Sequence, residues 1–137
     1  MSAIVRWKWM LNFREFQAGP DPFGRTYEVL FEWMQTAISL RHSDTVDVKF
    51  LLRSDGERAG KTIALPHADL LQLSKQTNHE LNDAWCCRLA AQHLLHLVET
   101  GEDLEKSLVT LSYPQLEEYA RMVAQEERSA VQQRGAA

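Results

Sequence analysis

The chain lacks the features that would mark it as a membrane or secreted protein. No apolar run approaches the roughly 18 residues that a membrane-spanning helix needs. The first ten residues place Arg6 and Lys8 among apolar neighbours, and no apolar segment with a cleavage site follows, so a signal peptide is not expected. The only two cysteines, Cys86 and Cys87, are adjacent, which is a poor geometry for a disulfide between them. We therefore expect a reduced, cytoplasmic setting.

Strong positive charge is also missing. The chain has 15 lysines and arginines against 19 aspartates and glutamates, which gives a net charge of −4. An acidic chain without a basic block lacks the electrostatic footprint of a general nucleic-acid binder. The length of 137 residues suits one domain that buries its own core. We predict a single domain over residues 1–131, followed by a short frayed tail at 132–137.

Familiar catalytic and cofactor-binding motifs are absent as well. The sequence has no GxGxxG or P-loop pattern for phosphates and no GxSxG for a nucleophilic serine. It also has no HExxH or CxxC pair for a metal ion. The sequence therefore assigns no catalytic residue and no cofactor.

The clearest pattern that is present is a two-residue period at residues 4–13. Bulky apolar side chains occupy one parity, and mostly polar side chains occupy the other. This alternation is typical of a β-strand with one buried face, so we expect two tryptophans in the core. The apolar parity is Val5, Trp7, Trp9, Leu11 and Phe13, and the other is Arg6, Lys8, Met10 and Asn12.

The rest of the chain predicts two further strands and several helices. A helical repeat from Tyr27 to Ile38 predicts a helix at 26–41, which becomes a right-handed crossover if the flanking strands pair in parallel. The predicted class is α+β, with a small sheet of about three strands packed against several helices in the order β-α-β-β-α-α-α-α. The remaining predicted elements are strands at 46–53 and 61–65, a solvated hairpin loop at 54–60, helices at 67–76, 78–99 and 113–131, and a turn near 103–109. Gly101 is expected to end the helix at 78–99, and a capping box of Ser112 and Gln115 is expected to begin the helix at 113–131.

The predicted helix at 78–99 carries the densest group of chemically capable side chains. His79, Cys86 and His93 recur every seven residues, with Asp83 beside them and His96 one turn after His93. Such side chains bind metals or perform thiol chemistry, so a small enzyme or metal protein is the alternative hypothesis. Residues seven apart are separated by about 10 Å along a helix, so one ion cannot join them without further ligands. An ordinary exposed helix face is the preferred interpretation.

Two single residues are also candidates for recognition. Arg88 falls on the apolar side of the same predicted helix, where an unpaired charge is costly. It is therefore either a structural residue, at the rim or in an internal ion pair, or an arginine that faces a groove and binds an anion or a partner. Phe23 lies in a loop at 17–25 that is rich in proline and glycine. It either anchors that loop or stands exposed for a partner.

The favoured hypothesis is a non-enzymatic protein-interaction module, such as an adaptor, regulator, chaperone-like protein or inhibitor. It would dock to a protein partner or to a second copy of itself as a dimer. Exposed apolar patches commonly mark interfaces, and a second apolar stripe on the predicted helix at 26–41 supplies one. The candidate interface residues are Val29, Trp33, Leu40, Phe23 and Arg88.

A second alternative is contact with nucleic acid through a basic sheet face. It requires the first two predicted strands to be neighbours, so that cations from both face the same side. The residues concerned are Arg6, Lys8, Lys49 and Arg53. The acidic balance of the chain argues against this alternative.

Overall fold

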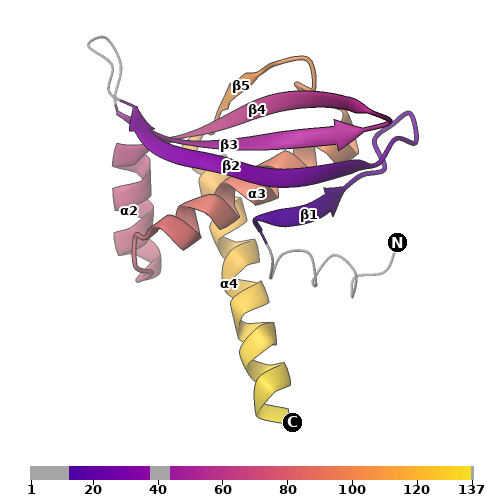
Figure 1. The fold of residues 1–137 in the computed structure, drawn as a ribbon. Coiled ribbons are helices and arrows are strands. Elements are labelled where there is room, and N and C mark those ends of the chain that lie inside the picture. Colours follow the sequence, from indigo (N-terminus) through magenta and orange to yellow (C-terminus); the bar gives the residue numbers. More distant parts are fainter. Residues whose placement is uncertain (1–12, 38–43, 137) are drawn as a thin grey trace.

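The computed structural model describes residues 13–37 and 44–136, and they form a sheet with helices packed on one of its faces (Figure 1). The class is therefore α+β, as predicted. The elements are β1 (Glu15–Ala18), β2 (Tyr27–Ala37), β3 (Thr45–Ser54), β4 (Glu57–Pro66), α2 (His67–Thr77), α3 (Asp83–Thr100), β5 (Leu108–Thr110) and α4 (Tyr113–Ala136).

The sheet has five strands rather than about three, in the spatial order β1-β2-β3-β4-β5. The first four strands form an antiparallel meander, and β5 pairs in parallel with β4. The helical crossover considered for residues 26–41 is not formed, because Tyr27–Ala37 form the strand β2. The short β5 takes the place of the predicted turn near 103–109.

The predicted helix at 26–41 is wrong, because Tyr27–Ala37 form β2. The reason is a β-bulge between Phe31 and Trp33 that shifts the register against β3. Val29 and Phe31 pair with the core-facing Leu52 and Phe50, and after the bulge Met34 pairs with the buried Val48. The bulge thus changes the core-facing parity and creates a three-residue spacing that resembles a helical repeat.

The predicted strand at 4–13 falls mostly outside the described residues, including Trp7, Trp9 and the basic Arg6 and Lys8. The one described residue of that segment, Phe13, is buried but lies in a turn. The strand that follows, β1, pairs with the first residues of β2. Leu40 also falls outside the described residues.

The hairpin between β3 and β4 is much tighter than the predicted loop at 54–60. Ser54 pairs with Glu57, so only Asp55 and Gly56 connect the strands. Both turn residues have positive φ, 51° and 80°. Asp-Gly is a preferred sequence for this kind of hairpin turn, because its twist matches that of the flanking strands. The strands therefore continue through most of the segment predicted to be loop.

Two predicted helix ends are confirmed and one start is displaced. Gly101 ends α3 in the left-handed conformation, and its amide donates to Leu97 O at 2.9 Å. Ser112 and Gln115 form the predicted capping box, with the Ser112 amide donating to Gln115 Oε1 at 2.9 Å. However, α3 begins after Asn82, whose side chain accepts from the Trp85 amide at 2.8 Å. His79 therefore precedes the helix.

The core lies between the sheet and the helices. Side chains such as Val29, Phe50 and Ile63 point to the covered face and are fully buried against the apolar side of α3. The opposite face has no described helix against it, and Trp33 and Lys49 pair there across β2 and β3. No helix among the described residues is long and apolar enough to cross a membrane.

A charged residue, Lys61, is also buried on the covered face. Its ammonium group donates to the carbonyls of Asp103 and Leu104, at 2.9 and 3.0 Å, and to the carbonyl of Lys106. Burial lowers the pKa of Lys61, and the neighbouring Glu105 and Asp103 oppose that effect. Lys61 thereby fastens the segment after α3 to the sheet.

Candidate functional site

The loop at 19–26, between β1 and β2, is organised around one carboxylate. Asp21 is almost fully buried, and its Oδ1 accepts from the amides of Phe23 and Arg25, at 2.9 and 2.8 Å. Its Oδ2 accepts from the Tyr27 hydroxyl at 3.0 Å. The amide of Gly24 also donates to Asp21 O at 2.9 Å, which closes a turn of four residues. The loop therefore has a fixed internal structure.

These hydrogen bonds also determine the electrostatics of the loop. Donation from the Arg25 amide is the main cause that lowers the pKa of Asp21 below its usual 3.8, and partial desolvation opposes it. The same arrangement raises the pKa of Tyr27, chiefly through burial and then through its bond to Asp21. The carboxylate is thus held ionised and the phenol neutral, which is the combination that the hydrogen bonds require.

The loop is also fastened to the rest of the molecule. Pro22 packs against the end of α3, because a Cβ placed on Gly101 would lie 2.9 Å from Pro22 Cγ. Arg25 forms an ion pair with Glu57 at 4.0 Å, and the Ser54 hydroxyl donates to Thr26 O at 3.0 Å. The last two contacts join the loop to the hairpin between β3 and β4.

The loop at 19–26, which these contacts hold in place, exposes Phe23 to solvent. The side chain of Phe23 is 92% exposed, the largest value among the large apolar residues found exposed in the described part of the chain. Of the two possibilities left by the sequence, the structure places Phe23 outward rather than as an anchor of the loop. An aromatic ring on a fixed loop is suited to recognition, because little conformational freedom remains to be lost on binding.

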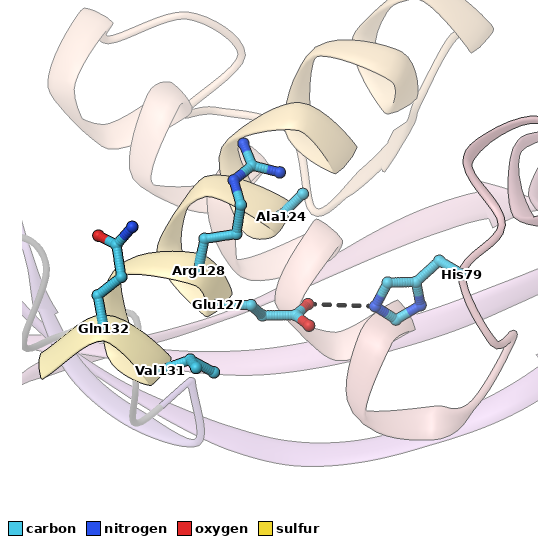
Figure 2. Close-up of a pocket in the computed structure, with 6 residues that line it drawn as sticks. All are labelled: His79, Ala124, Glu127, Arg128, Val131 and Gln132. Atoms are coloured by element: carbon cyan, nitrogen blue, oxygen red, sulfur yellow. Dashed lines mark hydrogen bonds and ion pairs between the residues drawn. The ribbon is translucent and has the colours of Figure 1, made fainter. Parts of the chain in front are cut away.

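A second site lies in a groove of about 490 Å³ between α4 and the segment that joins α2 to α3. Figure 2 shows His79 facing the Glu127 side chain across this groove, with Ala124, Val131 and Gln132 along α4. His79 Nε2 lies 3.1 Å from Glu127 Oε1, and Arg88 Nη1 lies 3.8 Å from the same oxygen. The carboxylate that Arg88 requires is therefore supplied by α4.

His79 is held in the groove from three sides. Its ring stacks on Trp85 with a centroid distance of 4.8 Å, and its Nδ1 lies 2.8 Å from Glu80 O. A backbone carbonyl and a carboxylate are both acceptors, so both contacts are satisfied when both ring nitrogens carry protons. Arg88 also lies over the Phe13 ring, with 5.6 Å to the centroid. The arrangement resembles a structural ion-pair network more than a reactive centre.

The remaining candidates for metal or thiol chemistry are not brought together. Cys86 and Cys87 are buried, and desolvation raises their pKa values to about 12 and about 11, which opposes formation of a nucleophilic thiolate. Asp83 is exposed in the first turn of α3, and His96 Nε2 contacts Glu102 Oε2 at 3.2 Å. Among the described residues, no group of three or more metal-binding side chains is placed around a common point.

His93 is buried and takes part in a pair that the sequence did not indicate. Its Nδ1 lies 2.7 Å from the Tyr119 hydroxyl. Burial lowers the pKa of His93 to about 4 and raises that of Tyr119 to about 12. Both groups are therefore uncharged near neutral pH, and one hydrogen bond joins the Tyr119 hydroxyl to the His93 imidazole.

The other candidate interface and nucleic-acid residues are dispersed. Val29 is fully buried and belongs to the core, whereas Trp33 is 36% exposed on the open face of the sheet. Lys49 and Arg53 lie on that face too, but they pair with Glu32 (3.6 Å) and Glu28. The described part of this face is therefore mixed in charge rather than basic.

Sequence reasoning missed the organising role of Asp21. The signal was present, because Asp21-Pro22-Phe23-Gly24 has Asp, Pro and Gly at the preferred positions of a type I turn. It also missed Glu127, Gln92 and Tyr119, whose roles depend on how α4 packs against α3. No family model, curated protein or solved structure matches the chain.

Proposed function

We propose that this protein is a docking module that binds a protein partner through the loop at 19–26. The observation that carries the proposal is the 92% exposure of Phe23 on a loop that is fixed by hydrogen bonds. The aromatic ring would enter an apolar pocket of the partner. Exposed aromatic anchors in desolvated pockets commonly supply much of the energy of a protein interface.

The way the loop is built supports this role. Asp21 organises the loop from inside, so Phe23 contributes little to its stability. A loop that only had to connect β1 and β2 would not need an apolar side chain at its tip. The charged neighbours Arg25 and Glu57 are paired and form a polar border beside the ring. An apolar centre with a polar border is the usual composition of an interface.

Site-specific photocrosslinking tests the proposal directly. p-Benzoylphenylalanine is placed at position 23 in one sample and at position 71 in a matched control. Leu71 is an exposed apolar residue on α2, with 42% of its side chain accessible. We expect one discrete crosslinked product from position 23 and none from position 71.

The second part of the crosslinking experiment uses a variant whose loop at 19–26 is less ordered. Asp21→Ala removes the acceptor for three donors but keeps the aromatic group at position 23. We expect the crosslinked product to decrease several-fold, because binding then has to order the loop. Equal crosslinking from positions 23 and 71, or a yield unaffected by Asp21→Ala, contradicts the proposal and indicates nonspecific adhesion.

A further inference from the structure

The second half of α4 is held to the rest of the molecule by few polar contacts. In Figure 1 this half, coloured yellow, extends away from the sheet. Glu126 accepts from Gln92 Nε2 at 2.7 Å, and Glu127 contacts His79 and Arg88. At residues 128–132, the described part of α4 makes no hydrogen bond or ion pair to another element. The contacts of Glu127 are therefore the last polar contacts that hold this helix to its neighbours.

The contacts of the His79 ring fit its protonated form. Its Nε2 lies 3.1 Å from Glu127 Oε1, and its Nδ1 lies 2.8 Å from Glu80 O. An ionised carboxylate and a backbone carbonyl only accept, so each contact needs a proton on the histidine. A neutral imidazole carries a single N–H and satisfies only one of the two. The geometry therefore favours the imidazolium and sets its charge against the Glu127 carboxylate.

The other groups around His79 fix its position but keep their own charge near neutral pH. The ring stacks on Trp85, and the backbone of His79 is hydrogen-bonded to Ser74 of α2. Arg88 of α3 lies 3.8 Å from the same carboxylate oxygen, and Arg128 of α4 lines the adjoining groove. Arginine does not lose its proton in proteins, whereas histidine changes charge between about pH 5 and about pH 8. Of these groups, the imidazole is the one that titrates near neutrality.

We propose that His79 makes a pH-dependent contact that controls how firmly the second half of α4 is held. The imidazolium attracts Glu127 and keeps α4 against the segment that joins α2 to α3. Loss of the proton removes this ion pair in either tautomer, and Glu127 then retains only Arg88, at 3.8 Å. The second half of α4 then separates more often, which opens the groove of about 490 Å³ that it forms with His79. A rise in pH thus loosens this end of the molecule.

Amide hydrogen exchange of the full chain, followed by NMR, tests this proposal. Protection factors are compared at about pH 6 and about pH 8, because they correct each rate for the intrinsic pH dependence of exchange. We expect protection at residues 124–131 to fall about two- to fivefold at the higher pH, as suits a partly exposed ion pair. Protection at residues 116–123, whose apolar side chains pack in the core, should stay constant.

Two matched variants assign the pH dependence to this contact. Glu127→Gln replaces the carboxylate with an amide, which donates or accepts and so suits both forms of His79. Protection at residues 124–131 should then be the same at both pH values. Glu102→Gln removes the same charge from another histidine–glutamate pair, in which His96 Nε2 lies 3.2 Å from Glu102 Oε2. This control should keep the wild-type change in protection.

The proposal is overturned if wild-type protection at residues 124–131 is the same at both pH values. It is also overturned if Glu127→Gln keeps the wild-type change or if Glu102→Gln removes it, because another titrating group would then be responsible. If Glu127→Gln does not fold, His79→Gln removes the titrating ring and carries the same expected result. None of these outcomes depends on docking through Phe23.

Discussion

Two connections at the same end of the sheet each join a pair of adjacent antiparallel strands, but they differ in length and structure. The hairpin between β3 and β4 needs only Asp55 and Gly56 to reverse the chain. The connection between β1 and β2 uses residues 19–26 to join another pair of adjacent antiparallel strands. The short connection is an ordinary type of hairpin turn. The long one carries a buried carboxylate and an exposed phenylalanine.

The comparison shows that the additional residues of the long loop adopt a fixed conformation rather than a loose one. They are held by Asp21 from within, by Pro22 against Gly101, and by contacts to Ser54 and Glu57 of the neighbouring hairpin. Long loops with a fixed structure are often functional, whereas two residues suffice for connection. The following changes separate the parts of the long loop that hold it together from the part that faces solvent.

Gly19→Ala should have the largest effect on stability. Gly19 has a φ of 119°, and a Cβ there would lie 2.8 Å from Arg25 O, so the backbone of the loop must move. We expect the free energy of unfolding to fall by about 3 kcal/mol, measured by urea denaturation. Gly24→Ala is the matched control, since Gly24 also has positive φ (84°) but nothing lies within 4 Å. Equal losses in the two variants would contradict close packing at Gly19.

Asp21→Ala should lower stability by less than Gly19→Ala, because the released amides can bond to water. The effect should also depend on pH. The folded pKa of Asp21 is lowered, so its contribution is fully present above the unfolded pKa of 3.8 and is lost as pH falls through the folded value. Urea denaturation of wild type and Asp21→Asn between about pH 6 and about pH 3 measures this. The difference in the free energy of unfolding between wild type and Asp21→Asn should become smaller as the pH falls. A difference that does not change with pH would contradict the role of the carboxylate.

Gly56→Ala should cost about 1 kcal/mol, which is the usual penalty for a left-handed residue other than glycine. Gly56 has a φ of 80°, and a Cβ there meets nothing within 4 Å. The neighbouring Asp55 already adopts positive φ. The loss should therefore resemble that of Gly24→Ala and remain below that of Gly19→Ala. If Gly56→Ala lowered the free energy of unfolding as much as Gly19→Ala, the long loop would be no more closely packed than the hairpin turn, and the comparison would fail.

The sequence predicted those parts of the fold whose signals are local. The capping box at Ser112 and Gln115 and the helix end at Gly101 depend on residues within one turn of each other. The strand β2 was missed because its bulge changes which parity faces the core, and the pattern of Phe31 and Met34 then suits a helix. Pairing with β3 fixes that bulge, and this pairing is not visible in β2 alone.

The candidate sites also divide into features with a local sequence signal and features that depend on tertiary packing. The prolines and glycines at 17–25 mark a loop locally, so Phe23 could be singled out, although its orientation could not. His79 and Glu127 are 48 positions apart, and their contact depends on the packing of α4 beside α3. The same packing joins His93 to Tyr119 and Gln92 to Glu126. Contacts of this kind are set by tertiary structure, which no spacing within one helix reveals.

The smallest expected change in stability gives the most direct measurement, which is Phe23→Ala assayed for both unfolding and docking. Because the Phe23 side chain is 92% exposed, its removal should change the free energy of unfolding by no more than about 0.5 kcal/mol. Capture of the partner identified by crosslinking should nevertheless fall at least tenfold. A large loss of stability, or capture equal to that of wild type, would contradict a loop that presents Phe23 for recognition.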